Sequence, residues 1–391
     1  VCRHLLKKGI KFVATDDKLE AVRAKPEAEF LLPYLKSVDD CLKEHVAQPV
    51  IASPGILPKH PLLQKATHIL GEIELAFQEC EKKKKAPILL GITGTNGKTT
   101  TTLLTTHMLH AGGIAAKAVG NIGEPLLDEI ETDDVLVVEL SSYQLETAST
   151  PMLSAGALLN ITPDHLDHHG SMQEYALAKF RMRSCIKKGG NFYLFENITA
   201  PEARTEGFKT YGFNPLSDIR SDGESIFRFG IKEAKLPEAL RGRKSHDVEN
   251  FLAAFALARD ADVAAQICVD SFATFQKPAH RIQFVKELNG VAYVDDSKGT
   301  NIDAVIRAVE SIPNTIVLIA GGVHKGESYS SWISAFSGRV KAIYAIGQAA
   351  PLMEKDLQAA IPVTVCKNLE EAVAHASQIA KSGETVLLSP G

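Results

Sequence analysis

The sequence predicts an α/β protein built from three domains with parallel sheets. At 391 residues the chain is too long for one ordinary hydrophobic core, so two or three domains are expected. Short apolar runs alternate with helical patterns along the chain, as in a doubly wound parallel sheet. The runs are apolar throughout, which is typical of strands buried on both faces of such a sheet. These runs are Pro49–Ile51, Ile88–Leu90, Val135–Val138, Ala157–Leu159, Ile316–Ile319 and Ala342–Ala345.

Composition and charge narrow the class of protein. The hydrophobic and charged fractions, 45% and 23%, are those of a globular protein, and the net charge of −4 gives no reason to expect nucleic acid or an anionic membrane as a partner. The sequence has no run long enough for a membrane span and no signal-peptide pattern. The six cysteines are scattered without a C-x-x-C pair, which favours reduced thiols in a cytoplasmic protein and leaves a catalytic thiol as a minor alternative.

Two breaks divide the chain. The charged stretch EKKKKAP marks a boundary near residue 76, and TFQKPAHR marks another near residue 278. The predicted domains are residues 1–76, 77–277 and 278–391. At the start, a helix closed by Gly9 and a predicted strand over Ile10–Ala14 lack the preceding strand of a βαβ unit, and the last strand runs into a turn. We therefore expect the native protein to extend past both termini.

The segment GITGTNGKTT joins an apolar strand to a helix. Glycines let a backbone approach a phosphate, consecutive N–H groups bind the anion, Lys98 adds a positive charge and Thr99 offers a hydroxyl to Mg²⁺. The general pattern G-x-x-x-x-G-K-[ST] fails at Ile92, but the strand before the loop and the helix after it, up to Gly112, match the expected context. The sequence therefore predicts binding of nucleotide phosphates.

A carboxylate and several histidines follow two further strands. Glu139 ends the strand after the phosphate loop, where it could hold Mg²⁺ or act as a structural carboxylate. The segment NITPDHLDHHG, residues 160–170, follows the next strand. Zinc and an ordinary loop histidine stay open as alternatives there, but the lack of a nearby cysteine favours a role for His165 near Mg²⁺ or phosphate.

The next helix carries a lysine on its apolar stripe. Ser171 and Glu174 form a predicted capping box at its start. The stripe consists of Tyr175, Lys179, Met182 and Ile186. A lysine in such a place usually extends its ammonium group to solvent. If Lys179 is buried instead, the neutral amine is favoured, and its carbamylation by CO₂ would create an anionic oxygen ligand for Mg²⁺.

Polar clusters follow the strands of the third predicted domain. KPAHRIQ carries Arg281 and GGVHKGES carries Lys325. VDDSKGTN carries Asp296, Lys298, Thr300 and Asn301. Each segment alone could be an ordinary polar loop. Because the carboxyl ends of parallel strands meet at one edge of a sheet, a shared ligand-binding face is the better interpretation.

Together these segments resemble the Mur ligases in order and spacing. The matching motifs are GITGTNGKTTT, VVELSSYQLE, NITPDHLDHHG, YALAK, HRIQ, DDSKGTN and GGVHKG, which span nearly the whole chain. The resemblance implies a Rossmann-like N-terminal domain that binds a UDP sugar, a central P-loop ATPase domain and a C-terminal Rossmann-like domain that brings an amino acid. ELSSYQLE and DDSKGTN are most similar to the family member that adds D-glutamate to UDP-N-acetylmuramoyl-L-alanine in cytoplasmic peptidoglycan synthesis.

The resemblance also implies ATP and two Mg²⁺ ions, and a role for each matching residue. The implied catalytic groups and metal ligands are Thr99 and Glu139 for one ion, His165 and carbamylated Lys179 for the second, and Lys98 for the terminal phosphates. The implied nucleotide contacts are Gly94, Thr95, Asn96, Gly97, Lys98, Thr99, Thr100, Asn250, Arg281 and Asp296. The implied substrate contacts are Asp16, Asp17, Lys18, Ser53, Gly55, Asn121, Ser141, Gln144, Lys298, Thr300, Lys325 and Ser389.

The implied reaction passes through an acyl phosphate, which the amine of the amino acid then attacks. We expect a monomer. A sister Mur ligase that adds another amino acid, such as L-lysine or diaminopimelate, is the first alternative. A nucleotide-binding paralogue without activity is the second, and the complete set of implied metal ligands argues against it.

Overall fold

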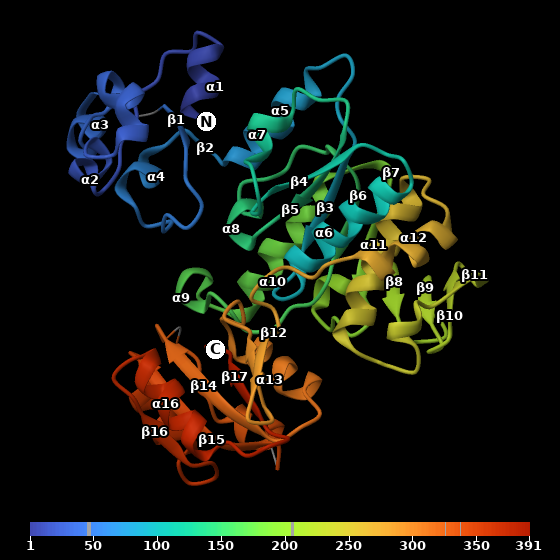
Figure 1. The fold of residues 1–391 in the computed structure, drawn as a ribbon. Helices are drawn as coiled ribbons and strands as arrows, with labels where there is room; N and C mark the ends of the chain where they lie inside the picture. Colours follow the sequence, from blue (N-terminus) through green and yellow to red (C-terminus); the bar gives the residue numbers. More distant parts are fainter. Residues whose placement is uncertain (45–47, 205–206, 325, 337) are drawn as a thin grey trace. The chain divides into compact units, whose positions relative to one another are not determined.

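Parallel strands form the centre of both parts of the chain, which confirms the predicted α/β class (Figure 1). We analysed a computed structural model that describes residues 1–391 except 45–47, 205–206, 325 and 337. Its residues divide into a first unit, Val1–Leu159 with Ala176–Thr274, and a second unit, Asn160–Tyr175 with Phe275–Gly391. The segment that carries His165 therefore groups with the C-terminal part of the chain.

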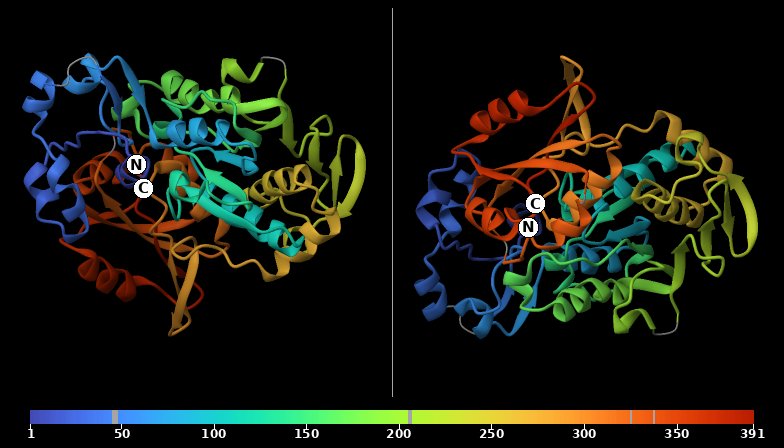
Figure 2. Two further views of the ribbon diagram at one scale, coloured as in Figure 1. Left: turned by 90° about the horizontal axis from the view of Figure 1, so that it is seen from above. Right: turned by 90° about the horizontal axis from the view of Figure 1, so that it is seen from below.

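The first unit is built on a nine-stranded sheet with the order β11-β10-β9-β8-β7-β6-β3-β5-β4. The strands from β9 to β4 pair in parallel, whereas β9, β10 and β11 pair antiparallel at the outer end of the sheet (Figure 2). The strands are β3 (Leu89–Thr93), β4 (Ala116–Gly120), β5 (Val135–Glu139), β6 (Leu153–Leu158), β7 (Ile186–Phe195), β8 (Lys209–Gly212), β9 (Ile219–Ser221), β10 (Ser225–Arg228) and β11 (Ile231–Lys235). β3 and β5 are buried along their whole length, as their unbroken apolar runs predict.

Helices α6, α11 and α12 pack together against this sheet. α6 begins at the phosphate loop and ends before Gly112, as predicted. The helices of this region are α5 (Glu72–Glu81), α6 (Lys98–Ala111), α7 (Leu126–Glu129), α8 (Ser142–Leu145), α10 (Met172–Phe180), α11 (His246–Asp260) and α12 (Ala265–Ser271). The short 3₁₀ segments are η2 (Arg181–Cys185), η3 (Pro201–Arg204), η4 (Glu238–Leu240) and η5 (Phe272–Thr274).

The N-terminal segment has little regular structure. It contains α1 (Cys2–Lys7), α2 (Leu19–Arg23), η1 (Pro26–Tyr34), α3 (Val38–Glu44), β1 (Pro49–Ile51), α4 (Pro61–Lys65) and β2 (His68–Leu70). The predicted strand over Ile10–Ala14 was wrong, because only Ala14 forms a bridge, to Leu35. A strand needs a ladder of backbone partners, and this segment has one contact in place of a ladder.

Helix α5 continues through residue 76, where the sequence predicted a domain boundary. Two glutamates fix it to neighbouring loops. Glu72 accepts a hydrogen bond from Leu127 N at 2.6 Å. Glu74, only 3% exposed, accepts from Ser149 N at 2.7 Å, Thr150 N at 3.1 Å and Thr150 Oγ1 at 2.6 Å. These bonds fasten α5 to the sheet-containing part of the first unit.

The second unit has a six-stranded sheet with the order β12-β13-β17-β14-β15-β16, in which only the β12–β13 pair is antiparallel. Its strands are β12 (Gln283–Leu288), β13 (Val291–Asp295), β14 (Ile316–Gly322), β15 (Val340–Gly347), β16 (Val363–Val365) and β17 (Thr385–Leu388). Its helices are α9 (Leu166–His169), α13 (Ile302–Ser311), α14 (Ser331–Ala335), α15 (Ala350–Leu357) and α16 (Leu369–Ile379). Alternate residues of β14 enter two cores, Leu318 with Trp332 and Val317 with Ala376, so the sheet is covered on both faces.

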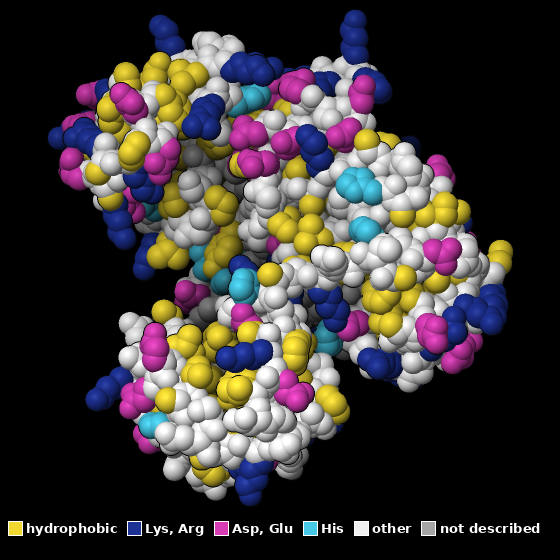
Figure 3. Space-filling view, viewed as in Figure 1, with side chains coloured by type: hydrophobic (Ala, Val, Ile, Leu, Met, Phe, Trp, Pro, Cys, Tyr) yellow, Lys and Arg dark blue, Asp and Glu magenta, His cyan; other side chains and the backbone are white. Residues whose placement is uncertain are grey.

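Side chains of both charges are interspersed on the face seen in Figure 3. All six cysteines are free thiols. Among the described residues, none of the helices has the length and hydrophobicity needed to span a bilayer.

We predict that Glu74→Ala lowers the free energy of unfolding by about 2–4 kcal/mol, because it removes a buried carboxylate that accepts hydrogen bonds from two backbone N–H groups and one hydroxyl group. Chemical denaturation followed by circular dichroism measures this. Glu20→Ala is the control, since Glu20 is 83% exposed and pairs with Arg23, and its loss should cost below about 0.5 kcal/mol. Equal effects of the two changes would contradict the anchoring role of Glu74.

Candidate active site

The phosphate loop lies between β3 and α6 and requires glycine at Gly97. This residue adopts a left-handed conformation, with φ +85°, and a Cβ there would collide with the amide group of Asn250. Lys98 Nζ donates to Gly94 O at 2.9 Å and Thr95 O at 2.8 Å, so its ammonium group lies over the loop. The N-terminus of α6, the loop N–H groups and Lys98 together form a binding site for an anion.

Lys179 is buried beside the same loop. Its side chain is 1% exposed, and its Nζ donates to Gly94 O at 2.9 Å. Of the two alternatives for this lysine, the structure therefore shows the buried one and not an ammonium group that extends to solvent. The reason is tertiary: α10 ends at Phe180, and the chain turns through η2 into β7, so Lys179 packs inward. Two amines, from Lys98 and Lys179, share one carbonyl.

Glu139 ends β5 next to the phosphate loop. The strand register pairs Glu139 with Ile92 of β3 and with Gly120 of β4. The Glu139 side chain is 2% exposed, and its Oε1 accepts from Asn121 Nδ2 at 2.9 Å. Its Oε2 is buried and has no hydrogen-bond partner among the described residues. A buried carboxylate oxygen without a donor is unfavourable unless a cation binds it, so the residues here fit a Mg²⁺ ligand.

Asn250 and the phosphate loop are in direct contact. Asn250 lies on α11, and its Oδ1 accepts from Thr101 Oγ1 at 3.3 Å. The structure therefore brings Asn250 to the predicted nucleotide site. Arg281 and Asp296, the other predicted nucleotide contacts outside the loop, belong to the second unit.

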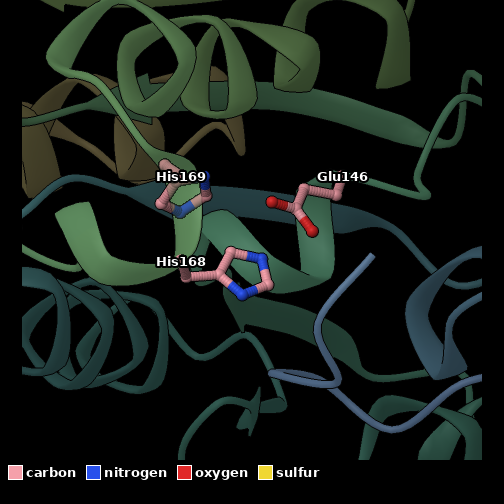
Figure 4. Close-up of side chains that lie close together, drawn as sticks. All are labelled: Glu146, His168 and His169. Carbon is pink, nitrogen blue, oxygen red and sulfur yellow. The ribbon is translucent and has the colours of Figure 1, made fainter. Parts of the chain in front are cut away.

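His165 begins α9 in a left-handed conformation, with φ +55°. Its backbone N donates to Asp164 Oδ1 at 3.1 Å, and Asn301 Nδ2 donates to Asp164 Oδ2 at 3.5 Å. His168 and His169 follow on α9, with ring centroids 4.9 Å apart in an edge-to-face arrangement (Figure 4). The predicted metal ligand therefore lies in a segment that is fastened to the second unit by the cap of α13.

The predicted polar face of the second unit is formed where β13 and β17 end. Asp296 is buried, and its Oδ2 accepts from Ser389 Oγ at 2.7 Å while its Oδ1 accepts from Ile282 N at 3.2 Å. Burial raises the pKa of Asp296 above its ordinary value, and these hydrogen bonds oppose that shift only in part. Ser389 is fully buried and contacts Asp296, whereas Lys298 and Thr300 are exposed. Lys325 lies outside the described residues.

One of the predicted uridine-diphosphate contacts, Asp17, lies against a histidine that the sequence did not single out. His60 Nε2 lies 3.1 Å from Asp17 Oδ1 and caps the start of α4, five residues after Gly55. Asp16 accepts from Lys18 N at 2.7 Å. The position of His60 before a proline and an apolar pair was the available signal, because helices commonly begin in this way.

Ser141 and Gln144, predicted as substrate contacts, form a capping box at the start of α8. Gln144 N donates to Ser141 Oγ at 3.2 Å, and Ser141 N donates to Gln144 Oε1 at 2.9 Å. The spacing S-x-x-Q was a signal for this cap that the sequence interpretation missed. Both side chains hold the turn that follows Glu139 in place.

The phosphate loop, the buried acid at the next strand end and the parallel sheet define the class, a P-loop nucleotide-binding protein. The model of the Mur ligase middle domain matches residues 92–258, and that of the Mur ligase, glutamate ligase domain matches residues 280–391. With the relatives described next, these matches show that the chain belongs to the Mur ligase family.

Two curated relatives carry the name UDP-N-acetylmuramoylalanine--D-glutamate ligase. The protein from Protochlamydia amoebophila is 46% identical over 88% of this chain and 78% of the relative. The protein from Chlamydia pneumoniae is 34% identical over 100% of this chain and 89% of the relative.

Solved Mur ligases share the fold. MurF from Acinetobacter baumannii has a TM-score of 0.65 at 17% identity, covering 81% of this chain and 76% of its own. The UDP-N-acetylmuramate-alanine ligase MurC from Thermotoga maritima has a TM-score of 0.62 at 16% identity, covering 100% and 91%.

We predict that Asp296→Asn raises the melting temperature at pH 7 by a few degrees while it lowers activity. A carboxyl group whose pKa is raised on folding stabilises the folded state below its unfolded pKa, and this contribution is lost as the pH rises through the folded pKa. The permanently neutral asparagine therefore gains over aspartate at neutral pH, and the gain should vanish near pH 3–4. Calorimetry across this range, with the exposed Asp270→Asn as control, measures it. A loss of stability at every pH would contradict the prediction.

Proposed function

We propose that this protein joins D-glutamate to UDP-N-acetylmuramoyl-L-alanine through an amide bond, with ATP as the energy source. The chain is an ATP-dependent ligase of the Mur family. The observation that carries the substrate assignment is the 46% identity, over 78% of its length, to a relative named for this reaction. Such a step belongs to cytoplasmic peptidoglycan synthesis, and the free cysteines are compatible with that compartment.

The first step is transfer of the ATP γ-phosphate to the carboxylate of the UDP substrate. Two anions must approach each other, so the barrier is largely electrostatic. Lys98 and the loop N–H groups bind the phosphates and offset that repulsion. Thr99 and Glu139 would hold Mg²⁺, which adds positive charge beside the transferred phosphate.

We further assign His165 and Lys179 to a second Mg²⁺, with Lys179 as its carbamate. Burial of the Lys179 amine beside a second ammonium group favours a modification that replaces the positive charge with a negative one. The carbamate offers the hard oxygen ligands that Mg²⁺ prefers.

The second step is attack of the amino acid on the acyl phosphate. Lys298, Thr300, Lys325 and Ser389 are the proposed contacts of D-glutamate, and Ser389 also donates a hydrogen bond to Asp296. Asn250, Arg281 and Asp296 are proposed nucleotide contacts, and Asn121 with the turn at Ser141 is proposed to contact the muramoyl part. Asp16, Asp17, Ser53 and Gly55 are proposed for the uridine diphosphate.

We predict ADP release that depends on D-glutamate when the protein is supplied with ATP, Mg²⁺ and UDP-N-acetylmuramoyl-L-alanine. L-glutamate, L-lysine and diaminopimelate are the comparison substrates, and a coupled assay for ADP is the measurement. Turnover with one of these three instead of D-glutamate would identify a sister ligase. A protein that binds ATP but turns over none of them would contradict the ligase assignment.

We predict that Lys179→Ala lowers kcat by at least about 100-fold, and that short-chain carboxylates restore a measurable part of it. The physical reason is that a small carboxylate can enter the space left by the side chain and supply the lost oxygen ligand. Lys188→Ala is the control, since Lys188 is exposed on β7. Activity of Lys179→Ala near that of the control would rule out the carbamate.

A further inference from the structure

Residues 280–282 form a strained corner in the second unit. His280 and Ile282 both have positive φ angles, +64° and +46°, and such a conformation is unusual for a β-branched residue. Three hydrogen bonds hold the corner: His280 N to Gln283 Oε1 at 2.8 Å, Ile282 N to Asp296 Oδ1 at 3.2 Å, and Lys298 N to His280 O at 3.2 Å. Strain of this kind persists where the surrounding structure imposes it, and it is concentrated at functional sites.

In this corner the His280 ring contacts the carboxylate of Asp295. His280 Nδ1 lies 2.6 Å from Asp295 Oδ2, and Ser297 N donates to Asp295 Oδ1 at 2.8 Å. Burial opposes ionisation of Asp295, but the hydrogen bonds from His280 and Ser297 outweigh it, so the pKa of Asp295 lies below its ordinary value. An ionised carboxylate only accepts hydrogen bonds, so Nδ1 donates to it, and Nε2 is the ring nitrogen that is left to exchange a proton with a substrate.

A stabilising role alone does not account for this arrangement. The His280 side chain is 55% exposed, and a pair of polar side chains at such a site contributes little to stability. Two residues in sparsely populated backbone regions destabilise the folded state by more than such a pair stabilises it. The pair is thus too weak to explain the strained corner. The corner does, however, hold the His280 imidazole in one orientation. It also joins His280 to Lys298, a proposed contact of the amino-acid substrate, through the hydrogen bond from Lys298 N to His280 O.

We propose that His280 is the general base that activates the incoming amino acid and that Asp295 is its positioning residue. This inference rests on the proposed ligase function. The ammonium group of the amino acid gives one proton to His280 Nε2, and the neutral amine attacks the acyl carbon. The C–N bond forms and the C–O bond to phosphate breaks, with its electron pair going to the phosphate. The second amine proton passes to that phosphate, and the imidazolium returns its proton to solvent.

The test compares two nucleophiles in the full chain with ATP, Mg²⁺ and UDP-N-acetylmuramoyl-L-alanine. D-glutamate arrives as an ammonium ion and needs the base, whereas hydroxylamine is largely unprotonated at neutral pH and needs none. We predict that His280→Gln lowers kcat with D-glutamate on the order of 100-fold, the usual range of general-base catalysis. Asp295→Asn should lower it by about 10-fold or more. Hydroxamate formation should stay within about two-fold of wild type in both variants, which also shows that they fold.

His375→Gln is the matched control, because this histidine lies on α16 with its ring against Tyr344 and should leave both reactions unchanged. Equal loss of both nucleophilic reactions in His280→Gln would overturn the proposal, since His280 would then act in folding or phosphate transfer. Retention of D-glutamate turnover would overturn it as well. If the wild-type protein released ADP with neither nucleophile, the ligase function itself would fall.

Discussion

The contact of two lysines with one backbone carbonyl is the interaction on which the phosphate site depends. Lys98 and Lys179 both donate to Gly94 O at 2.9 Å. Their nitrogen atoms therefore lie within about 6 Å of each other, a distance at which two ammonium groups repel. Binding of phosphate, or conversion of the Lys179 amine to a carbamate, removes that repulsion. The loop is in this way adapted to anions before any substrate arrives.

The carboxylates of Glu74, Glu139 and Glu196 in the first unit fall into two groups according to their hydrogen-bond donors. Glu74 and Glu196 accept hydrogen bonds on both oxygens and fasten loops to the first unit. Glu139, in contrast, keeps one buried oxygen without a donor among the described residues. A carboxylate that the fold satisfies completely contributes to stability. One that is left incompletely satisfied is available for a metal ion, a nucleotide or a proton.

In both units, residues of the candidate site lie at the carboxyl ends of parallel strands. In the first unit, β3 leads into the phosphate loop and β5 ends at Glu139. In the second unit, β13 leads into Asp296 and β17 into Ser389. The strained corner at His280 is held by a hydrogen bond from Ile282 N to Asp296, the residue that follows β13. The same Asp296 carboxylate is part of the polar face of the second unit.

The sequence by itself determined the α/β class, the position of the phosphate loop and the strand ends that carry Glu139 and Asp296, because these depend on local patterns of apolar residues and glycines. Tertiary structure decided what local patterns leave open. Lys179 is buried because the chain turns after Phe180, and the segment over Ile10–Ala14 lacks a ladder of partners. Asp295 lies 15 residues from His280 along the chain, so only folding could show the contact between these two side chains.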